Sequence, residues 1–479
     1  MKLRICEADL HLTDLRTRLP FKYGIATMTQ MPMAFVRLRV EVAGRQSLGI
    51  ATDVLPPKWF TKAPAREVRE EIQEMVRVIE HALQLAIGLS GESPFDVWRE
   101  LYETQLLWAE DQQLPPLLAN FGTSLVERAL LEAYCRALGK PFYRLLLGNQ
   151  LGIRLGEIHP VLDALTPADL LPASPLNEVT VRHTVGLADP LNDADIAPDQ
   201  QLNDGLPQSL AANIRAYGLR HFKIKVSGEL TPDTERLVRV AEIIQQNAGE
   251  HFACTLDGNE QFHSIENFRA YWESLARVEA LLEFRARLLF VEQPLHRAEA
   301  LQPIVGEAFR AWPERPPIII DESDATLESL PAALALGYSG TSHKNCKGIF
   351  KSIANRCLLL HRQRTESVRF ALMSGEDLCN VGPVALLQDF AVCAALGIRS
   401  VERNGHHYNA GLSQFPATVQ EQMLKGHGDL YQRSAAGWPT LHIVNGNVTL
   451  TTVNESPFGV RFLLDAAQFT PAAKWRPAK

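Results

Sequence analysis

The sequence lacks several features that would place it in a familiar class. It contains no apolar run of 18 residues, so it offers no candidate transmembrane helix. Neither GxGxxG nor GxxxxGKS/T follows an expected strand, which argues against dinucleotide or ATP chemistry. Its 48 Lys and Arg against 55 Asp and Glu give a net charge of -7, without blocks of one sign. Nucleic acid and anionic membranes are therefore not expected partners.

Cysteine is scarce and scattered. The seven cysteines never form a Cys-x-x-Cys pair, so we expect free thiols rather than structural zinc or a disulfide framework. The first residues alternate polar and apolar side chains and lack the apolar stretch of a signal peptide. We therefore expect a cytoplasmic protein.

The 479-residue chain is too long for one ordinary core, and its patterning divides it into three parts. The first 55 residues predict antiparallel strands, and residues 64–147 have a helical period that ends one helix at Gly139. These features predict a separate N-terminal α+β unit over residues 1–155. Residues 411–479 contain a hairpin-like stretch with Asn445-Gly446 at its turn.

Between these parts, residues 156–410 alternate short apolar runs with helical segments. Strands are predicted at 179–186, 221–226, 252–257, 287–292, 317–321, just before His343, 368–373 and 398–402. Helices are predicted at 208–218, 232–248, 265–279, 298–309, 349–361 and 382–396. Eight strands with intervening helices predict a (β/α)8-type barrel, whose catalytic groups gather at the carboxyl ends of the strands. The polar stretch 187–207 is expected to be a long loop.

Lysines stand at the end of the second predicted strand and after the sixth. Lys223 and Lys225 lie two residues apart, so both side chains point to the same side of the strand. Two close ammonium groups lower each other's pKa, and a lysine tuned in this way can act as a base. Lys344 would lie across the barrel mouth from them. A surface lysine pair and a basic turn are the simpler interpretations of each segment taken alone.

Acidic residues follow three consecutive predicted strands. Asp257, Glu292 and Asp321 supply hard oxygen ligands of the kind that suit Mg²⁺ or Mn²⁺. Asn259 stands where it can orient such a ligand, and Glu322 competes with Asp321 for the ligand role; we assign Glu322 a supporting position. Any one acid alone would indicate an exposed carboxylate or a helix cap, but three in register favour a metal site.

Taken in order, the segments KIK, DGN, VEQP, IDES and KNCKG resemble the enolase superfamily, in particular its muconate-lactonizing-enzyme-like subgroup. The N-terminal strands look like the capping domain of that family, and ALLEAYCRALGKPFYRLLLG resembles the segment before its barrel. The resemblance implies that residues 1–155 form an N-terminal α+β capping domain and that residues 411–479 pack back on it. The sequence departs from the family pattern at Gly348-Ile349, where a double glycine is usual. Residues 374–377 and 402–408 match no known feature of the family.

The resemblance implies that Mg²⁺, or Mn²⁺, holds the carboxylate of a small-molecule substrate while a lysine removes the neighbouring α-proton. The resulting enediolate, stabilised by the metal charge, would lead to racemisation or epimerisation, dehydration, or cycloisomerisation. By position, Lys225 would be the base on one face, Lys223 its electrostatic partner and Lys344 the acid or base on the other face. Asp257, Glu292 and Asp321 would be the metal ligands.

The resemblance also bears on specificity and assembly. Residues near Tyr23 and Trp59 in the capping loops, and His406 after the last strand, are the candidate specificity residues. A homo-oligomer is expected. Two alternatives stay open: a metal-free barrel enzyme that forms a Schiff base through Lys225 or Lys344, and a non-catalytic descendant that retains the metal site.

Overall fold

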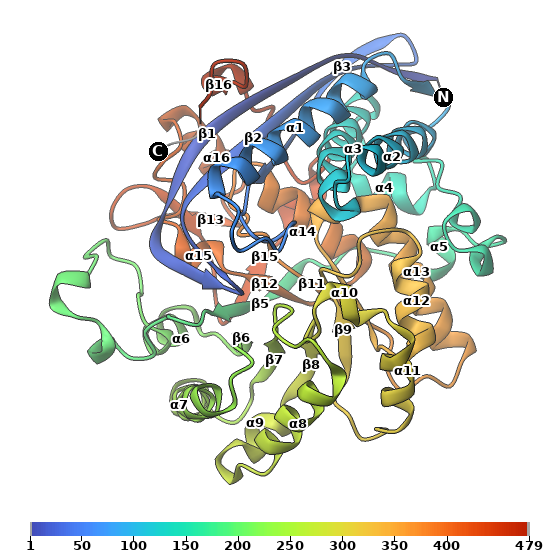
Figure 1. Ribbon diagram of the computed structural model, residues 1–479. Helices are drawn as coiled ribbons and strands as arrows, with labels where there is room; N and C mark the ends of the chain where they lie inside the picture. Colours follow the sequence, from blue (N-terminus) through green and yellow to red (C-terminus); the bar gives the residue numbers. More distant parts are fainter. Residues whose placement is uncertain (1, 477–479) are drawn as a thin grey trace.

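The computed structural model describes residues 2–476 and contains a closed barrel of eight parallel strands (Figure 1). The barrel strands follow the chain order from β5 to β12, and β12 pairs with β5 to close the sheet. They are β5 (Glu178–Val185), β6 (His221–Lys225), β7 (Ala253–Asp257), β8 (Leu288–Glu292), β9 (Ile318–Ile320), β10 (Gly340–His343), β11 (Leu372–Gly375) and β12 (Ser400–Arg403). The predicted fold class is confirmed.

Helices connect the strands and cover the outside of the barrel. The main ones are α6 (Leu210–Tyr217), α7 (Leu230–Ala248), α8 (Ile265–Ala276), α11 (Pro303–Arg310), α12 (Ser329–Leu336), α13 (Ile349–Thr365) and α14 (Ala385–Leu396). Short helices are α9 (Leu282–Ala286), α10 (Arg297–Ala300) and α15 (Gly405–Tyr408). Helix α12 was not predicted, because its short Leu- and Ala-rich sequence has no amphipathic period. Strand β11 begins four residues later than expected.

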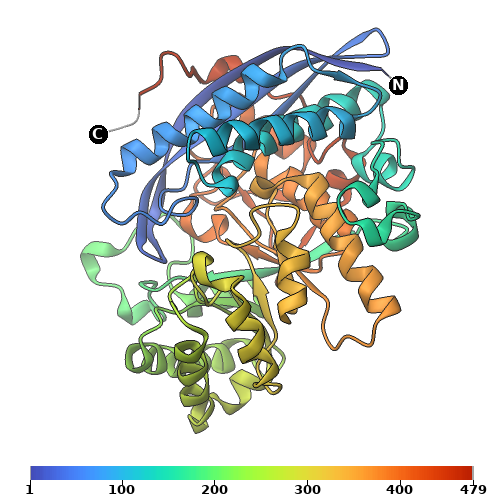
Figure 2. The same ribbon diagram turned by 45° about the vertical axis from the view of Figure 1, so that its right-hand side comes forward.

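The capping domain lies above the barrel in Figure 2. Its antiparallel sheet contains β1 (Leu3–Tyr23), β2 (Ala26–Val42) and β3 (Arg45–Val54), with the two-residue β4 (Ser90–Gly91) beside β1. Its helices are α1 (Val68–Ala86), α2 (Pro94–Asp111), α3 (Pro116–Leu138), α4 (Phe142–Leu147) and α5 (Pro167–Leu170). Gly49 allows β3 to approach α3, because an added Cβ would lie only 2.0 Å from the Ala129 carbonyl oxygen.

The C-terminal segment contacts both the barrel and the cap. It contains α16 (Ala417–Gly426), β13 (Tyr431–Arg433), β14 (Pro439–Leu441), β15 (Asn447–Thr449), α17 (Thr451–Glu455) and β16 (Thr470–Pro471). Strand β16 pairs with β1 of the cap. Asn445 and Gly446 form the expected turn, with positive φ angles of 49° and 76°. A single bridge between Val444 and Asn447 closes this turn, so no regular hairpin forms. The strand after the turn, β15, pairs instead with barrel strand β5.

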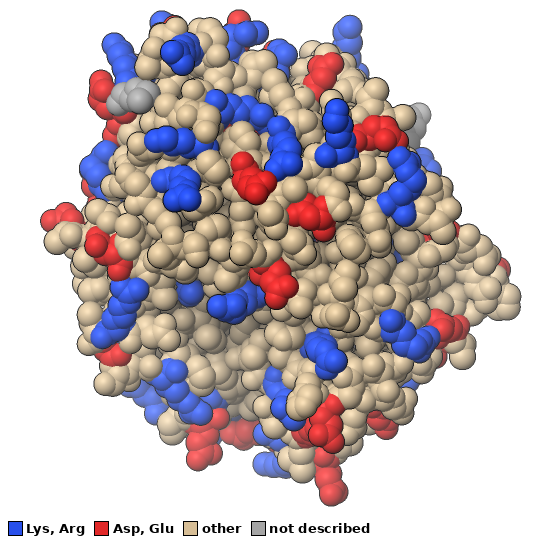
Figure 3. Space-filling view, turned by 180° about the vertical axis from the view of Figure 1, so that it is seen from behind, with Lys and Arg blue, Asp and Glu red and all other residues tan. Residues whose placement is uncertain are grey.

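The stretch 187–207 is a loop that projects from the barrel, on the left in Figure 1. Arg18 of the cap binds the Asp204 carboxylate at 2.7 Å and also donates to the carbonyl oxygens of Leu206 and Pro207. Lys and Arg side chains mix with Asp and Glu side chains over the face shown in Figure 3, with no large patch of one sign. No helix within residues 2–476 combines the length and apolar character that crossing a membrane requires.

Candidate active site

The six predicted lysines and metal-binding acids all lie at the carboxyl ends of the barrel strands and are all buried. Lys223 and Lys225 lie on β6, Asp257 ends β7, Glu292 ends β8, Asp321 follows β9 and Lys344 follows β10. Ion pairs join Lys223 and Lys225 to Asp257 and Glu292, and a separate ion pair joins Lys344 to Asp321. Asp257, Glu292 and Asp321 each stand at the end of an apolar strand run, at the barrel mouth, whereas Lys344 follows the polar strand Gly340–His343.

The Lys223 ammonium group is surrounded by carboxylates. Four of them lie 2.6–3.0 Å from its Nζ atom, namely Asp257, Glu292, Glu376 and Glu402. We call these four residues the carboxylate ring. Burial alone would lower the pKa of Lys223, but the carboxylate ring raises it well above its usual value. The expectation that a neighbouring lysine depresses the pKa of Lys223 is therefore wrong, since the carboxylates outweigh that repulsion.

Two members of the carboxylate ring were not assigned a role from the sequence. Glu376 follows β11 and Glu402 lies on β12, so they occupy the same kind of strand-end position as the predicted acids. Arg182 also binds Glu376, and the Thr184 hydroxyl donates to Glu402 at 2.6 Å. Applying the strand-end rule to the last two strands would have found both residues. The family pattern did not include them.

Asp321 is held by a separate pair of lysines. Lys344 Nζ lies 2.5 Å from Asp321 Oδ2, and Lys347 Nζ lies 3.1 Å from Oδ1. Burial would raise the pKa of Asp321, but these two ammonium groups lower it well below its usual value. Asp321 in turn raises the pKa of Lys344 despite the burial of that lysine. Both groups are therefore charged in this structure.

The predicted supporting residues lie beside the network. The Asn259 amide group donates to Glu322 Oε1 at 3.4 Å, and the Asn259 backbone N–H donates to Asp257 at 2.8 Å. Burial and the nearby Asp321 carboxylate raise the pKa of Glu322 to about 7. Asn259 therefore contacts the predicted ligand Asp257 directly, and Glu322 is joined to it through the Asn259 side chain.

A cavity of about 30 Å³ lies over this network, with room for about two water molecules. It is lined by Phe21, Tyr23, Met28, Pro56, Trp59, Lys225, Asn259, Lys344, Asp377, Leu378, Cys379, Glu402 and Asn404. The cavity thus brings together lysines from the second and sixth strands with aromatic side chains of the cap. Lys344 Nζ lies 4.6 Å from the centre of the Trp59 ring, within cation–π range.

Of the three candidate specificity residues, Tyr23 and Trp59 line this cavity and His406 does not. His406 instead lies outside the barrel strands, with its Nε2 atom 3.0 Å from Nδ1 of His183. Residues 405–408 form helix α15, which directs the His406 side chain toward β5 and Tyr217. The assignment of His406 to the specificity set finds no support in its position.

The chemistry of the predicted metal ligands suits a hard cation, although their arrangement is not that of a compact ligand set. The cluster of three metal-binding side chains found within residues 2–476 lies elsewhere, and the oxygens of Asp257, Glu292 and Asp321 are spread among lysines. Glu292 Oε2 is buried and makes no aligned hydrogen bond, although Lys223 Nζ lies 2.8 Å from it. Five carboxylates face the four ammonium groups of Lys223, Lys225, Lys344 and Lys347. Arg182 adds a fifth cation at Glu376. The oxygen donors fit a divalent cation such as Mg²⁺.

No family model matches the sequence, and a search of curated proteins finds no match. Solved structures match over nearly the whole chain. A muconate lactonizing enzyme from Pseudomonas fluorescens, complexed with muconolactone, is 16% identical with a TM-score of 0.60, covering 97% of this chain and 98% of that one. An enolase from P. fluorescens Pf0-1, with bound magnesium, potassium and tartrate, is 14% identical with a TM-score of 0.59 and coverages of 98% and 91%.

A third match is a dipeptide epimerase from Enterococcus faecalis V583, complexed with Mg and the dipeptide L-Leu-L-Tyr. It is 16% identical with a TM-score of 0.55, and the alignment covers 93% of this chain and 99% of that one. At such low identity the three structures establish a shared fold, namely a capped (β/α)8 barrel.

Proposed function

We propose that this chain is a member of the enolase superfamily that abstracts the proton α to the carboxylate of a small-molecule substrate, with Mg²⁺ as its cofactor. The observation that supports this proposal best is the placement of Lys225 and Lys344. They come from β6 and from the residue after β10, nearly opposite one another in the barrel, and both line one cavity above buried carboxylates. A substrate held between them would present one face to each lysine.

Asp257, Glu292 and Asp321 are the proposed metal ligands. Bound there, Mg²⁺ would hold the substrate carboxylate and stabilise the negative charge that develops when the α-proton leaves.

The ion pairs of the two cavity lysines give them a defined starting state. Lys225 Nζ lies 2.6 Å from Asp257, and Lys344 Nζ lies 2.5 Å from Asp321. When such an aspartate binds another cation, its lysine partner loses the ion pair and becomes free to act as a base. We assign Lys225 and Lys344 to the two faces of the substrate, and Lys223 to the fixed positive charge that holds the carboxylate ring together.

The cavity wall indicates the kind of group that lies beyond the reacting carbon. Phe21, Tyr23, Trp59 and Leu378 supply apolar surface, and the cavity is small in this structure. We therefore propose a carboxylate with an apolar or aromatic substituent, among the acids open to racemisation, epimerisation, dehydration or cycloisomerisation.

The test is exchange of the α-proton in D₂O, followed by ¹H NMR on a panel of N-acyl amino acids, dipeptides and acid sugars. We expect exchange with Mg²⁺ and none after EDTA treatment. Lys225→Ala or Lys344→Ala should slow exchange by at least about 100-fold, the usual contribution of a general acid or base. Lys425→Ala, which changes an exposed lysine of α16, serves as the control.

The outcomes separate the competing functions. Exchange that continues unchanged in EDTA contradicts the metal-dependent mechanism. A borohydride-trapped adduct on either lysine would support the Schiff-base alternative. Mg²⁺ binding without exchange on any acid of the panel would favour a non-catalytic metal-binding protein.

A further inference from the structure

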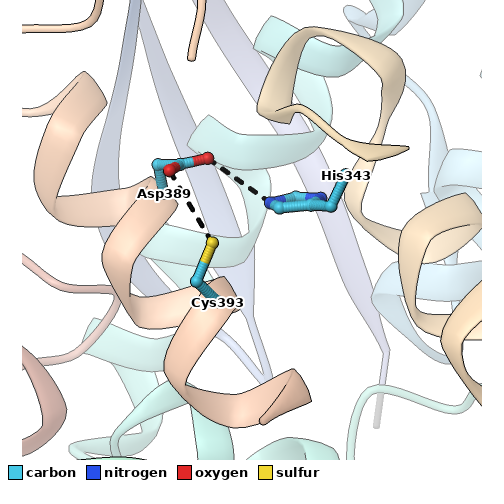
Figure 4. Close-up of side chains that lie close together, drawn as sticks. All are labelled: His343, Asp389 and Cys393. Atoms are coloured by element: carbon cyan, nitrogen blue, oxygen red, sulfur yellow. Dashed lines mark hydrogen bonds and ion pairs between the residues drawn. The ribbon is translucent and has the colours of Figure 1, made fainter. Parts of the chain in front are cut away.

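A second group of potential metal ligands lies outside the barrel mouth, between β10 and α14. His343 ends β10, and Asp389 and Cys393 lie one helical turn apart on α14 (Figure 4). Within residues 2–476 these three form the group in which imidazole, carboxylate and thiol atoms all lie within 4.8 Å of one another. All three side chains are fully buried. The proposed proton-transfer function uses none of them.

Hydrogen bonding defines which His343 nitrogen carries a proton. The Ser352 hydroxyl donates to the Gly348 carbonyl oxygen at 2.8 Å, so at His343 it must accept a proton from Nδ1, also at 2.8 Å. In a neutral imidazole, Nε2 then bears a lone pair. Nδ1–H bonding of this kind is the usual way in which a metal-binding histidine is oriented.

The lone pair on His343 Nε2 faces an oxygen of Asp389 that has no hydrogen-bond donor. His343 Nε2 lies 3.4 Å from Asp389 Oδ1, and neither atom has a hydrogen-bond partner. The other Asp389 oxygen accepts from Arg403, so Oδ1 is the free one. Two buried acceptors that face each other repel unless a proton or a metal ion lies between them.

The distance between His343 Nε2 and Asp389 Oδ1 favours a metal ion over a shared proton. A hydrogen bond between an imidazolium and a carboxylate is about 2.7–2.9 Å long, shorter than the gap observed here. Two ligands bound at about 2.0–2.1 Å in a tetrahedral site are about 3.4 Å apart. The Cys393 thiol, whose Sγ atom lies 3.8 Å from Asp389 Oδ2, supplies a third ligand that a simple proton bridge does not need.

The backbone also leaves room for the thiol. A Cβ atom added at Gly375 of β11 would lie 3.1–3.3 Å from side-chain atoms of Val401, Ile398 and Cys393, so the glycine lets the thiol pack close to β11. Nitrogen, oxygen and sulfur ligands together suit Zn²⁺ better than Mg²⁺. On binding, the thiol would form a sulfur–zinc bond and release its proton to solvent.

We propose that His343 Nε2, Asp389 Oδ1 and Cys393 Sγ bind one Zn²⁺ ion that fastens strand β10 to helix α14. Full burial keeps substrates away from this ion, so its role is structural. Since Lys344 follows His343 directly, the ion fixes the strand end that carries one of the cavity lysines. This zinc site does not depend on the function of the barrel mouth.

The test is zinc analysis of the full-length protein, together with Co²⁺ substitution. We expect about one zinc per chain and, with Co²⁺, a thiolate charge-transfer absorption band. Cys393→Ser should abolish that band and lower zinc content at least about 10-fold. Cys357→Ser, which alters another buried helix cysteine outside the cluster, should preserve both.

X-ray absorption at the zinc edge of the wild-type protein gives a readout that needs no variant. One sulfur at about 2.3 Å with nitrogen and oxygen at about 2.0–2.1 Å would support the site. A wild-type protein without zinc and without a cobalt band overturns the proposal in favour of a protonated His343. A band that survives Cys393→Ser overturns it too, because the metal would then be bound elsewhere.

Discussion

At the scale of single residues, Lys223 determines the character of the barrel mouth. Its ammonium group contacts all four members of the carboxylate ring, and its side chain has no exposed surface. A buried ion network adds little net stability compared with apolar packing, but removing one partner leaves uncompensated charge. Lys223 is therefore better suited to hold acids in place than to give or take a proton.

Replacing Lys223 by methionine should be strongly destabilising. The change leaves four buried carboxylates without their shared cation, so we expect the free energy of unfolding at pH 7 to fall by about 3–5 kcal/mol. Urea unfolding measures this loss. Lys425→Met, at an exposed site on α16, should change the unfolding free energy by no more than about 0.5 kcal/mol. A Lys223→Met protein as stable as the wild type would contradict the role assigned to the network.

At the scale of secondary-structure elements, helix α13 is capped by a residue from another domain. The Glu127 carboxylate on α3 accepts from the backbone N–H groups of Ile349 at 3.0 Å and Phe350 at 2.7 Å. These are first-turn N–H groups that an α-helix cannot satisfy internally. Because the segment before α13 carries Lys344 and Lys347, the cap contact positions the mouth lysines.

Glu127→Ala should weaken this contact measurably. Two buried N–H groups would lose their acceptor, so we expect a loss of about 1–3 kcal/mol in unfolding free energy together with slower proton exchange. Glu127→Gln retains one acceptor oxygen and should lose less. Glu80→Ala on the exposed side of α1 is the matched control. Equal stability of the Ala variant and the wild type would show that the cap is not needed.

The junction between β5 and α15 should make the fold sensitive to acid. Burial lowers the pKa of both His183 and His407 to about 3, and Asp189 is the carboxylate nearest to them. Below pH 6.5 these two histidines bind protons in the unfolded chain but stay neutral in the folded chain. Stability present above pH 6.5 is therefore lost as the pH falls toward 3, by about 1.4 kcal/mol per unit and per histidine.

Urea unfolding at pH 6.5 and pH 5 tests this dependence. His183→Gln should reduce the loss, whereas His251→Gln, at an exposed position, should leave it unchanged. An unfolding free energy that does not fall between these two pH values would contradict the neutral, buried state of the histidines.

At the scale of the whole molecule, the C-terminal segment joins the two other parts. Strand β15 pairs with β5 of the barrel and β16 pairs with β1 of the cap. Phe469 stacks on Phe35 of β2, with ring centres 3.8 Å apart. The segment from residue 411 onward therefore completes the cap sheet and also covers the first barrel strand.

Phe469→Ala tests the contribution of this docking. Removing the buried ring should lower the free energy of unfolding by about 3 kcal/mol through lost burial and the cavity that remains. Leu463→Ala, which truncates an exposed leucine of the same segment, should have a small effect in the same denaturation experiment. A small effect of Phe469→Ala would mean that the segment is held mainly by its backbone pairing.

Much of the fold and part of the site follow from local sequence patterns. Apolar runs such as Ile318–Ile320 predict buried parallel strands, and the polar residues after them predict the barrel mouth with its lysines and acids. Most strand and helix ends agree with the structure within a few residues. Helix α12 was not predicted, because a short run of Leu and Ala without a helical period does not distinguish a helix from a strand.

The amino-acid sequence by itself determined the capped barrel and the residues that stand at its strand ends. The reason is that buried positions recur along the chain with the period of each strand or helix. Only the tertiary structure decided which of those residues meet. Glu376 and Glu402 join Lys223 from positions more than 150 residues away, and Cys393 reaches His343 from a helix 50 residues on. Barrel closure brings these groups together, and a local pattern carries no information about a contact that closure creates.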